Sequence, residues 1–114
     1  MNFARTFALG AMAGLVAAAL ATSPARAAEI EVKIENFTFN PQQITVKAGD
    51  TVTWINHDDI PHTVTSKTLK FRSKAMDTDD KFSFTFATPG TFPYFCSLHP
   101  HMTGSIVVEA AAGK

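Results

Sequence analysis

The chain has a single cysteine among its 114 residues, so it cannot form an internal disulfide bond. It also has no excess of either charge, because ten Lys and Arg residues balance ten Asp and Glu residues. Two of the cations precede residue 28, so residues 28–114 have eight cations and ten anions and a formal charge of −2. This balance gives no indication of a nucleic-acid partner or of any strongly charged one.

Long apolar runs are scarce, and the one present lies near the start of the chain. Residues 7–21 carry no charge, follow a cation, and precede a small-x-small pattern at Ala25-Arg26-Ala27. This order is typical of a secretory signal peptide, and a run of about 15 residues is too short for the alternative, a transmembrane anchor. We expect residues 1–27 to be a signal peptide cleaved near Ala27 on export to the periplasm, and residues 28–114 to form one domain.

Helical periodicity is missing from residues 28–114. Apolar and polar residues alternate instead in short stretches, most clearly at 30–35 and 82–87. Turn sequences recur at intervals of about ten residues, which favours a β-sandwich or a β-barrel. The sequence therefore predicts an all-β domain of about seven to eight short strands.

Two local predictions concern less regular parts of the chain. Residues 47–50 form a turn sequence, and we expect the strands before and after it to pair. The stretch 66–80 is polar, with a basic run from Lys67 to Lys74 followed by aspartates, and gives no clear strand pattern. The basic run is a solvated loop or a surface that steers an acidic partner.

The lone cysteine is followed by a histidine and then by a methionine, each three residues further along: Cys96, His99 and Met102. A site of two His, one Cys and a weak axial Met is the geometry of electron-transfer copper sites. The second histidine must come from elsewhere, and His62, between Pro61 and a β-branched pair, is the best candidate. We therefore predict His62, Cys96, His99 and Met102 as the ligands of one copper ion.

Other assignments of these residues are open. Cys96 shares the parity of Phe92 and Tyr94, so its sulfur points into the core, where it is either a ligand or a small buried hydrophobic group. His101 could replace Met102 in the ligand set, although we expect it at the solvent-facing rim of the site. We expect His57, which is flanked by polar residues, to lie in an exposed turn.

Three motifs together resemble the cupredoxins, the small blue copper proteins, and most closely those of the amicyanin type. They are the stretch from Asp50 to Asn56, the Pro61-His62 pair, and the loop from Cys96 to Met102 with two residues between successive ligands. The resemblance extends over residues 30–109 and implies a Greek-key β-sandwich with the metal at one end. It also implies copper as the cofactor, held by His62, Cys96, His99 and Met102.

The resemblance further implies a docking surface, an apolar patch through which the edge of His99 reaches the protein surface. Residues that could form the patch are Ile60, Pro61, Met76, Leu98 and Pro100. The implied partners are redox proteins such as a c-type cytochrome or a periplasmic dehydrogenase, bound by a monomer.

Two positions depart from the pattern of the family. Thr63 stands where many cupredoxins have Asn, and His101 stands where an aromatic residue is usual. The first departure affects the groups around the thiolate, and the second makes the docking surface more polar.

We therefore predict a periplasmic blue copper protein that carries single electrons by Cu(II)/Cu(I) cycling. The alternative is a periplasmic copper chaperone or storage protein that passes on the ion itself. An enzyme is not expected, because a copper oxidase needs a second copper, and only two histidines remain outside the predicted ligand set. The chain also lacks a Ser-His-Asp pattern and a glycine-rich phosphate loop.

Overall fold

The computed structural model describes residues 27–111, and these form two packed β-sheets. The predicted signal peptide therefore lies almost wholly outside the described residues. The described part contains eight strands and confirms the predicted all-β sandwich. They are β1 (Glu29–Glu35), β2 (Thr38–Asn40), β3 (Gln43–Lys47), β4 (Asp50–Asn56), β5 (Thr65–Ser66), β6 (Lys81–Phe86), β7 (Gly90–Cys96) and β8 (His99–Glu109).

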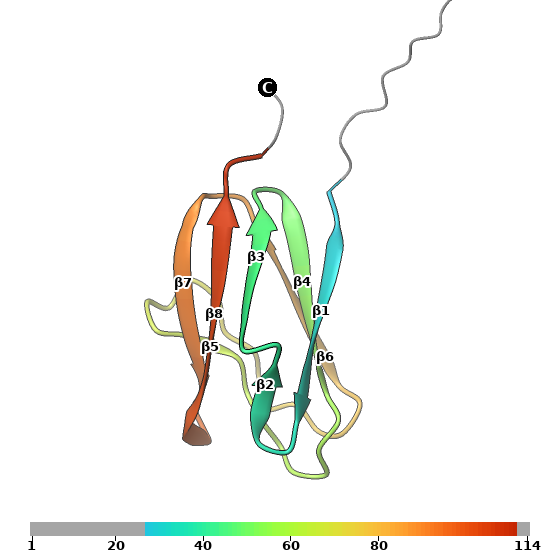
Figure 1. Ribbon diagram of the computed structural model, residues 1–114. Coiled ribbons are helices and arrows are strands. Elements are labelled where there is room, and N and C mark those ends of the chain that lie inside the picture. Colours follow the sequence, from blue (N-terminus) through green and yellow to red (C-terminus); the bar gives the residue numbers. More distant parts are fainter. Residues whose placement is uncertain (1–26, 112–114) are drawn as a thin grey trace, which may run out of the picture.

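Each sheet has four strands and mixes parallel with antiparallel pairs (Figure 1). In the first sheet the order is β2-β1-β4-β6, and β1 is parallel to β4. In the second sheet the order is β3-β8-β7-β5, and β3 is parallel to β8. The β1–β2 hairpin and the β7–β8 turn both lie at the lower end of the sandwich in Figure 1.

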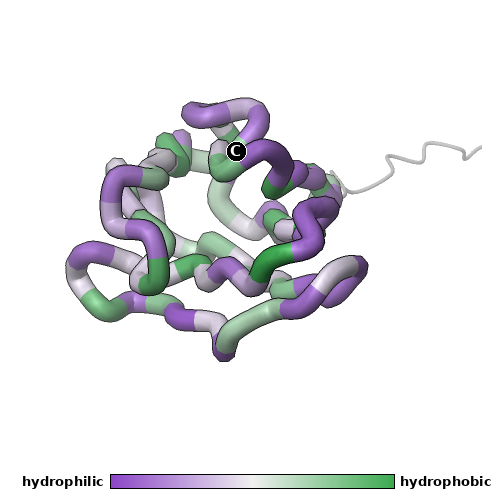
Figure 2. Tube along the Cα trace, turned by 90° about the horizontal axis from the view of Figure 1, so that it is seen from below, coloured by the Kyte–Doolittle hydropathy of each residue, from purple (hydrophilic) through white to green (hydrophobic). Residues whose placement is uncertain are grey.

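The core lies between the two sheets and is rich in aromatic side chains. Alternate residues of β4 and β7 point inward, so that Trp54 and Tyr94 are fully buried and their rings meet edge to face at 5.4 Å between centroids. Phe71, from the segment after β5, stacks on Trp54 at 5.9 Å. Seen along the strands, the chain encircles this interior, and hydrophilic and hydrophobic segments alternate along the tube (Figure 2).

The strands on either side of residues 47–50 do not pair with one another, so this expectation was wrong. β3 belongs to the second sheet and β4 to the first. The turn instead bonds to the ends of both sheets: the Ala48 N–H donates to Glu109 and the Gly49 N–H to Phe86. The Asp50 carboxylate accepts from the Lys47 N–H at 2.8 Å, and Gly49 has a φ of +102°, which suits glycine. The turn thus passes the chain from one sheet to the other.

The polar stretch 66–80, which has no clear strand pattern in its sequence, begins in a narrow two-stranded ribbon. Residues 62–66 run antiparallel to residues 71–76, with bridges between His62 and Met76 and between Thr65 and Arg72. Within residues 27–111 there is no helix long and apolar enough to cross a membrane.

Candidate metal centre

Three of the four predicted ligands come together in the structure at the lower end of the sandwich. The Sγ of Cys96 lies 3.8 Å from Nδ1 of His62 and 3.6 Å from Nδ1 of His99. All three donor atoms lie within 4.8 Å of one another. Among residues 27–111 this is the only such group of three His, Cys, Asp or Glu side chains.

The fourth predicted ligand, Met102, is 5% exposed and belongs to the core cluster that also contains Cys96. It lines the same shallow surface hollow as His99. A thiol, two imidazoles and a thioether are therefore available at one place, from which water is largely excluded because His62 and Cys96 are fully buried. This donor set fits a copper ion, for which soft sulfur ligands and imidazoles are both suitable.

The segment from Cys96 to Met102, which the sequence indicated as a loop, lies mostly within a strand. β8 begins at His99, so only two residues separate it from β7. The register shifts between Phe95 and Cys96, which places Cys96 opposite His99. This irregularity brings the imidazole and the thiol to the same side of the hairpin.

The backbone of His62 is fixed from the opposite side of the site by the ribbon that follows β4. Its N–H donates to the carbonyl of Met76 at 3.2 Å, and its carbonyl accepts from the Met76 N–H at 2.8 Å. The Asn56 side chain donates to the same Met76 carbonyl at 2.9 Å. The backbone of His62 is thus held in a hydrogen-bonded ribbon rather than in a free loop.

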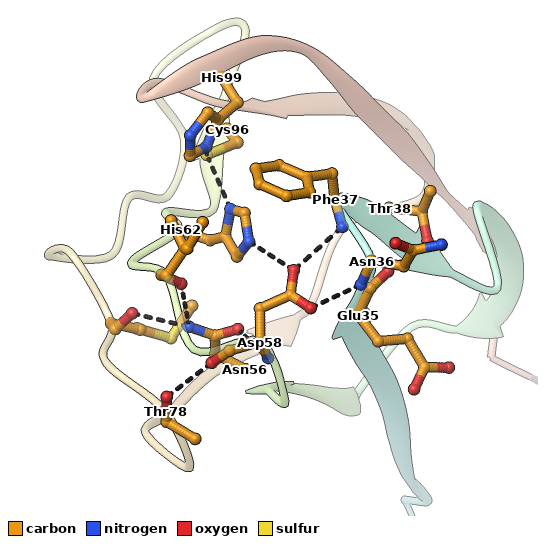
Figure 3. A network of polar contacts seen from close by, with 12 residues as sticks. Glu35, Asn36, Phe37, Thr38, Asn56, Asp58, His62, Thr78, Cys96 and His99 are labelled. Carbon is orange, nitrogen blue, oxygen red and sulfur yellow. Dashed lines mark hydrogen bonds and ion pairs between the residues drawn. The ribbon is translucent and has the colours of Figure 1, made fainter.

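The imidazole of His62 is oriented by Asp58, as Figure 3 shows. Its Nε2–H donates to Oδ2 of Asp58 at 2.7 Å. Because a carboxylate can only accept, this bond fixes the proton on Nε2 and leaves the lone pair of Nδ1 facing Cys96. The orientation is the one that a metal-binding histidine requires.

Asp58 is itself held by the turn between β1 and β2. Its carboxylate accepts from the backbone N–H groups of Asn36 at 2.6 Å and Phe37 at 3.0 Å. Burial alone would raise the pKa of Asp58, but these two backbone donors and His62 outweigh that effect and leave the pKa below its usual value. The carboxylate is therefore ionised near neutral pH and available to His62.

Phe37, which the sequence did not mark as part of the site, contacts both histidine ligands predicted there. Its ring meets that of His62 edge to face at 5.3 Å and that of His99 at 5.1 Å. The two imidazoles lie 4.9 Å apart. Asn36 and Phe37 have φ values of 54° and 60°, as the two-residue turn requires, although Asn36 was the only sequence signal for that turn.

The thiol of Cys96 receives one backbone hydrogen bond, from the N–H of Thr63 at 3.3 Å. The Thr63 hydroxyl accepts from the Ser97 N–H at 2.7 Å and also bonds to the Ser97 hydroxyl at 2.8 Å. Thr63, at the position where many cupredoxins have Asn, thus ties the residue after His62 to the residue after Cys96. Ser97 does not bond to the sulfur itself.

We expected three further residues at the surface of this end of the molecule: His57, His101 and Met76. His57 and His101 are exposed, as expected, and neither belongs to the group of donor atoms. Met76 is 4% exposed and cannot contribute to a surface patch, so that expectation was wrong. Its side chain packs in the core because its backbone pairs with that of His62.

The apolar surface around His99 includes one residue that was not expected. A shallow hollow there is lined by Phe37, Leu98, His99, Pro100, His101 and Met102. Leu98 and Phe37 are 50% and 45% exposed. His99 is half-buried and lines this hollow.

Comparisons with known proteins identify the family of this chain. A family model described as a cupredoxin-like domain matches residues 7–108. The chain belongs to the cupredoxin-like family. Amicyanin-alpha of Methylorubrum extorquens is 38% identical over 108 residues, which cover 90% of this chain and 91% of the relative. Among cupredoxins, the chain is also similar to plastocyanin of Scenedesmus fuscus, at 32% identity over 62% of this chain and 86% of that protein.

Solved cupredoxin structures resemble the fold as a whole. A Cu(I) structure of an amicyanin variant matches with a TM-score of 0.67 and 36% identity, covering 70% of this chain and 81% of that one. A second amicyanin variant in the Cu(I) form matches with a TM-score of 0.68 and 37% identity, covering 75% and 86%. The resemblance to the cupredoxins that the sequence motifs indicated is therefore confirmed.

Proposed function

We propose that this protein is a type 1 (blue) copper protein that carries single electrons between redox partners. The observation that carries the proposal is the buried thiol of Cys96, which faces one nitrogen from each of two imidazoles. Bound copper would supply a reversible Cu(II)/Cu(I) couple. Kinship with amicyanin and plastocyanin supports an electron carrier rather than an enzyme.

In this proposal the residues that would hold the copper are His62, Cys96, His99 and Met102. Cys96 supplies the thiolate, and the N–H of Thr63 stabilises its negative charge. Asp58 orients His62, and the backbone of β8 positions His99 and Met102. These groups are fixed by strands and by hydrogen bonds, so the donor atoms would move little when bound copper changes its oxidation state. Small movements of the ligands favour fast electron exchange.

The half-buried His99 is the ligand through which electrons would pass to and from partners. Its imidazole lies in the hollow beside Phe37 and Leu98, which fits a small and transient contact with another protein. The partners would be a c-type cytochrome or a periplasmic dehydrogenase, bound by a monomer. We also propose that residues 1–27 are a signal peptide cleaved near Ala27 and that the domain of residues 28–114 acts in the periplasm.

Stopped-flow mixing of the oxidised, copper-loaded protein with a reduced c-type cytochrome tests this function. The proposal predicts rapid oxidation of the cytochrome in a one-to-one ratio, with the copper retained by the protein. The alternative, a copper chaperone or storage protein, predicts that the ion passes to a competing chelator while the cytochrome stays reduced. That second outcome would rule out the carrier.

A further inference from the structure

The ribbon that begins at His62 ends in a well-defined turn at the edge of the second sheet. Residues 62–66 pair with residues 71–76, and the Ser66 N–H donates to the carbonyl of Phe71 at 2.9 Å. The Leu69 N–H donates to the carbonyl of Ser66 at 3.1 Å and closes the turn. Phe71 is buried against Trp54, so the turn is anchored in the core. In Figure 1 this segment projects at the side of the sandwich, next to β7.

The turn places one apolar side chain in solvent. Leu69 is 74% exposed, more than any other large hydrophobic residue of the described chain. Its φ is 61°, a left-handed conformation that is unfavourable for a residue with a branched side chain. A leucine here thus combines backbone strain with an exposed apolar surface, and neither stabilises the isolated fold.

Four cations lie within five residues of this leucine along the chain: Lys67, Lys70, Arg72 and Lys74, all of them exposed. Within residues 27–111 none of the four forms an ion pair, since the one pair there joins His62 and Asp58. The rest of that range contains three cations against ten anions. Residues 67–74, which we call the basic tip, therefore form a concentrated positive surface on an acidic body.

We infer that the basic tip is a docking surface for a protein partner that presents carboxylates around an apolar spot. Leu69 would fill the apolar spot, and the cations would pair with the carboxylates and steer the approach. A membrane surface fits less well, because a wide anionic plane would also meet the acidic body. The inference rests on the proposed function only in taking the partner to be a redox protein.

Docking at the basic tip is distinct from contact at the hollow beside His99. The basic tip and that hollow share no residue, and the ribbon connects the basic tip to His62 at its base. Leu69 follows His62 by seven positions along the chain, so the two residues lie at most about 23 Å apart. A partner of ordinary size can therefore contact both surfaces, with the basic tip setting its orientation.

The test is a titration of the isotope-labelled, copper-loaded protein with a c-type cytochrome of net negative charge, followed by backbone amide shifts. We expect shifts in residues 64–74 at low ionic strength that disappear as salt is added. In the variant Lys67→Glu/Lys70→Glu, the dissociation constant should rise at least about tenfold. The control Lys33→Glu/Lys47→Glu makes the same charge change at exposed positions of β1 and β3 and should change it by less than about twofold.

A second variant tests the apolar side chain of the basic tip separately from its charge. Leu69→Gly removes the apolar side chain and suits the left-handed conformation, so it should weaken the binding while leaving the melting temperature unchanged or higher. An unchanged affinity of this variant would contradict a role for the leucine.

Three outcomes overturn the inference. Shifts confined to residues 97–102 would show that the partner uses only the hollow. If the two charge variants lost affinity for the cytochrome equally, the binding would depend on net charge alone. Binding to vesicles of anionic phospholipid, lost in Leu69→Gly, would assign the basic tip to a membrane. Because amide shifts report binding without electron transfer, failure of the cytochrome oxidation would refute the carrier and leave this result standing.

Discussion

Asp58 links the buried imidazole of the candidate site to the β1–β2 turn. Its carboxylate bonds to Nε2 of His62 and to two backbone N–H groups of the turn that carries Phe37. One side chain therefore orients a predicted ligand and holds the aromatic ring that packs on both imidazoles. The placement of the donor atoms therefore depends on this residue as well.

Asp58→Asn should weaken copper binding about 10- to 100-fold, the usual effect of removing a carboxylate partner from a metal-binding histidine. An amide can still accept hydrogen bonds, but it lacks the charge that strengthens the bond to Nε2–H. Competition with a chromogenic chelator measures the affinity. Asp59→Asn, at the exposed neighbouring position, is the matched control and should bind as the wild type does. If Asp58→Asn bound copper as tightly as the wild type, Asp58 would have no orienting role for His62.

The candidate ligands that lie on one short segment could be predicted from the sequence. Cys96, His99 and Met102 are close along the chain, and their side chains indicate one kind of metal. Asp58 and Phe37 were not predicted, because an aspartate beside a histidine and an exposed phenylalanine are common in any sequence. Their roles arise only when the β1–β2 turn and the segment after β4 meet in space.

At the scale of elements, β8 positions half of the candidate site and depends on a close contact with β7. Gly104 lies opposite Tyr94 in the strand pair. A Cβ at Gly104 would lie 2.4 Å from Cζ of the Tyr94 ring, well inside van der Waals contact. The absence of a side chain at this position lets the two strands and the buried ring pack together.

Gly104→Ala should therefore destabilise the protein by about 2 kcal/mol, the usual cost of forcing an extra methyl group into a packed core. Chemical denaturation of the copper-free protein measures this change. Ser105→Ala, at the next position of β8, is only half-buried and serves as the control, with an expected change below about 0.5 kcal/mol. If both variants unfolded at the same denaturant concentration, the contact would not limit packing.

Strand positions were easier to predict than strand partners. Alternation in 30–35 and 82–87 marked β1 and β6, because a half-buried strand exposes every second residue. The pairing of β3 with β4 was predicted wrongly, because a short turn usually joins neighbours in one sheet. Here Asp50 and Gly49 form bonds that direct the chain across the sandwich, and this depends on the distant ends of β6 and β8.

For the molecule as a whole, Tyr94 gives a single optical probe of the core. It is the only tyrosine of the chain, it is fully buried, and its hydroxyl forms no hydrogen bond of normal geometry. Burial raises the pKa of Tyr94 from 10.0 to about 12, with a smaller opposing effect of the Trp54 indole N–H. The folded protein therefore keeps the phenol protonated at a pH where the unfolded chain ionises.

This shift predicts an alkaline loss of stability. The contribution of Tyr94 is fully present below pH 10 and is lost as the pH rises toward about 12, because only the unfolded chain releases the proton in that range. Denaturation at several pH values measures the slope, and phenolate absorbance measures the ionisation. Tyr94→Phe should lack this component. Reversible ionisation near pH 10 in the folded protein would contradict the burial.

The visible spectrum after addition of Cu(II) tests whether Cys96 and two histidines form a blue copper site. The wild type should develop one intense visible band at one equivalent of copper, because the thiolate donates charge to the metal. Cys96→Ser should not develop this band, while it keeps the same fold by circular dichroism. An intense band that persists in Cys96→Ser, or its absence from the copper-loaded wild type, would contradict the assignment.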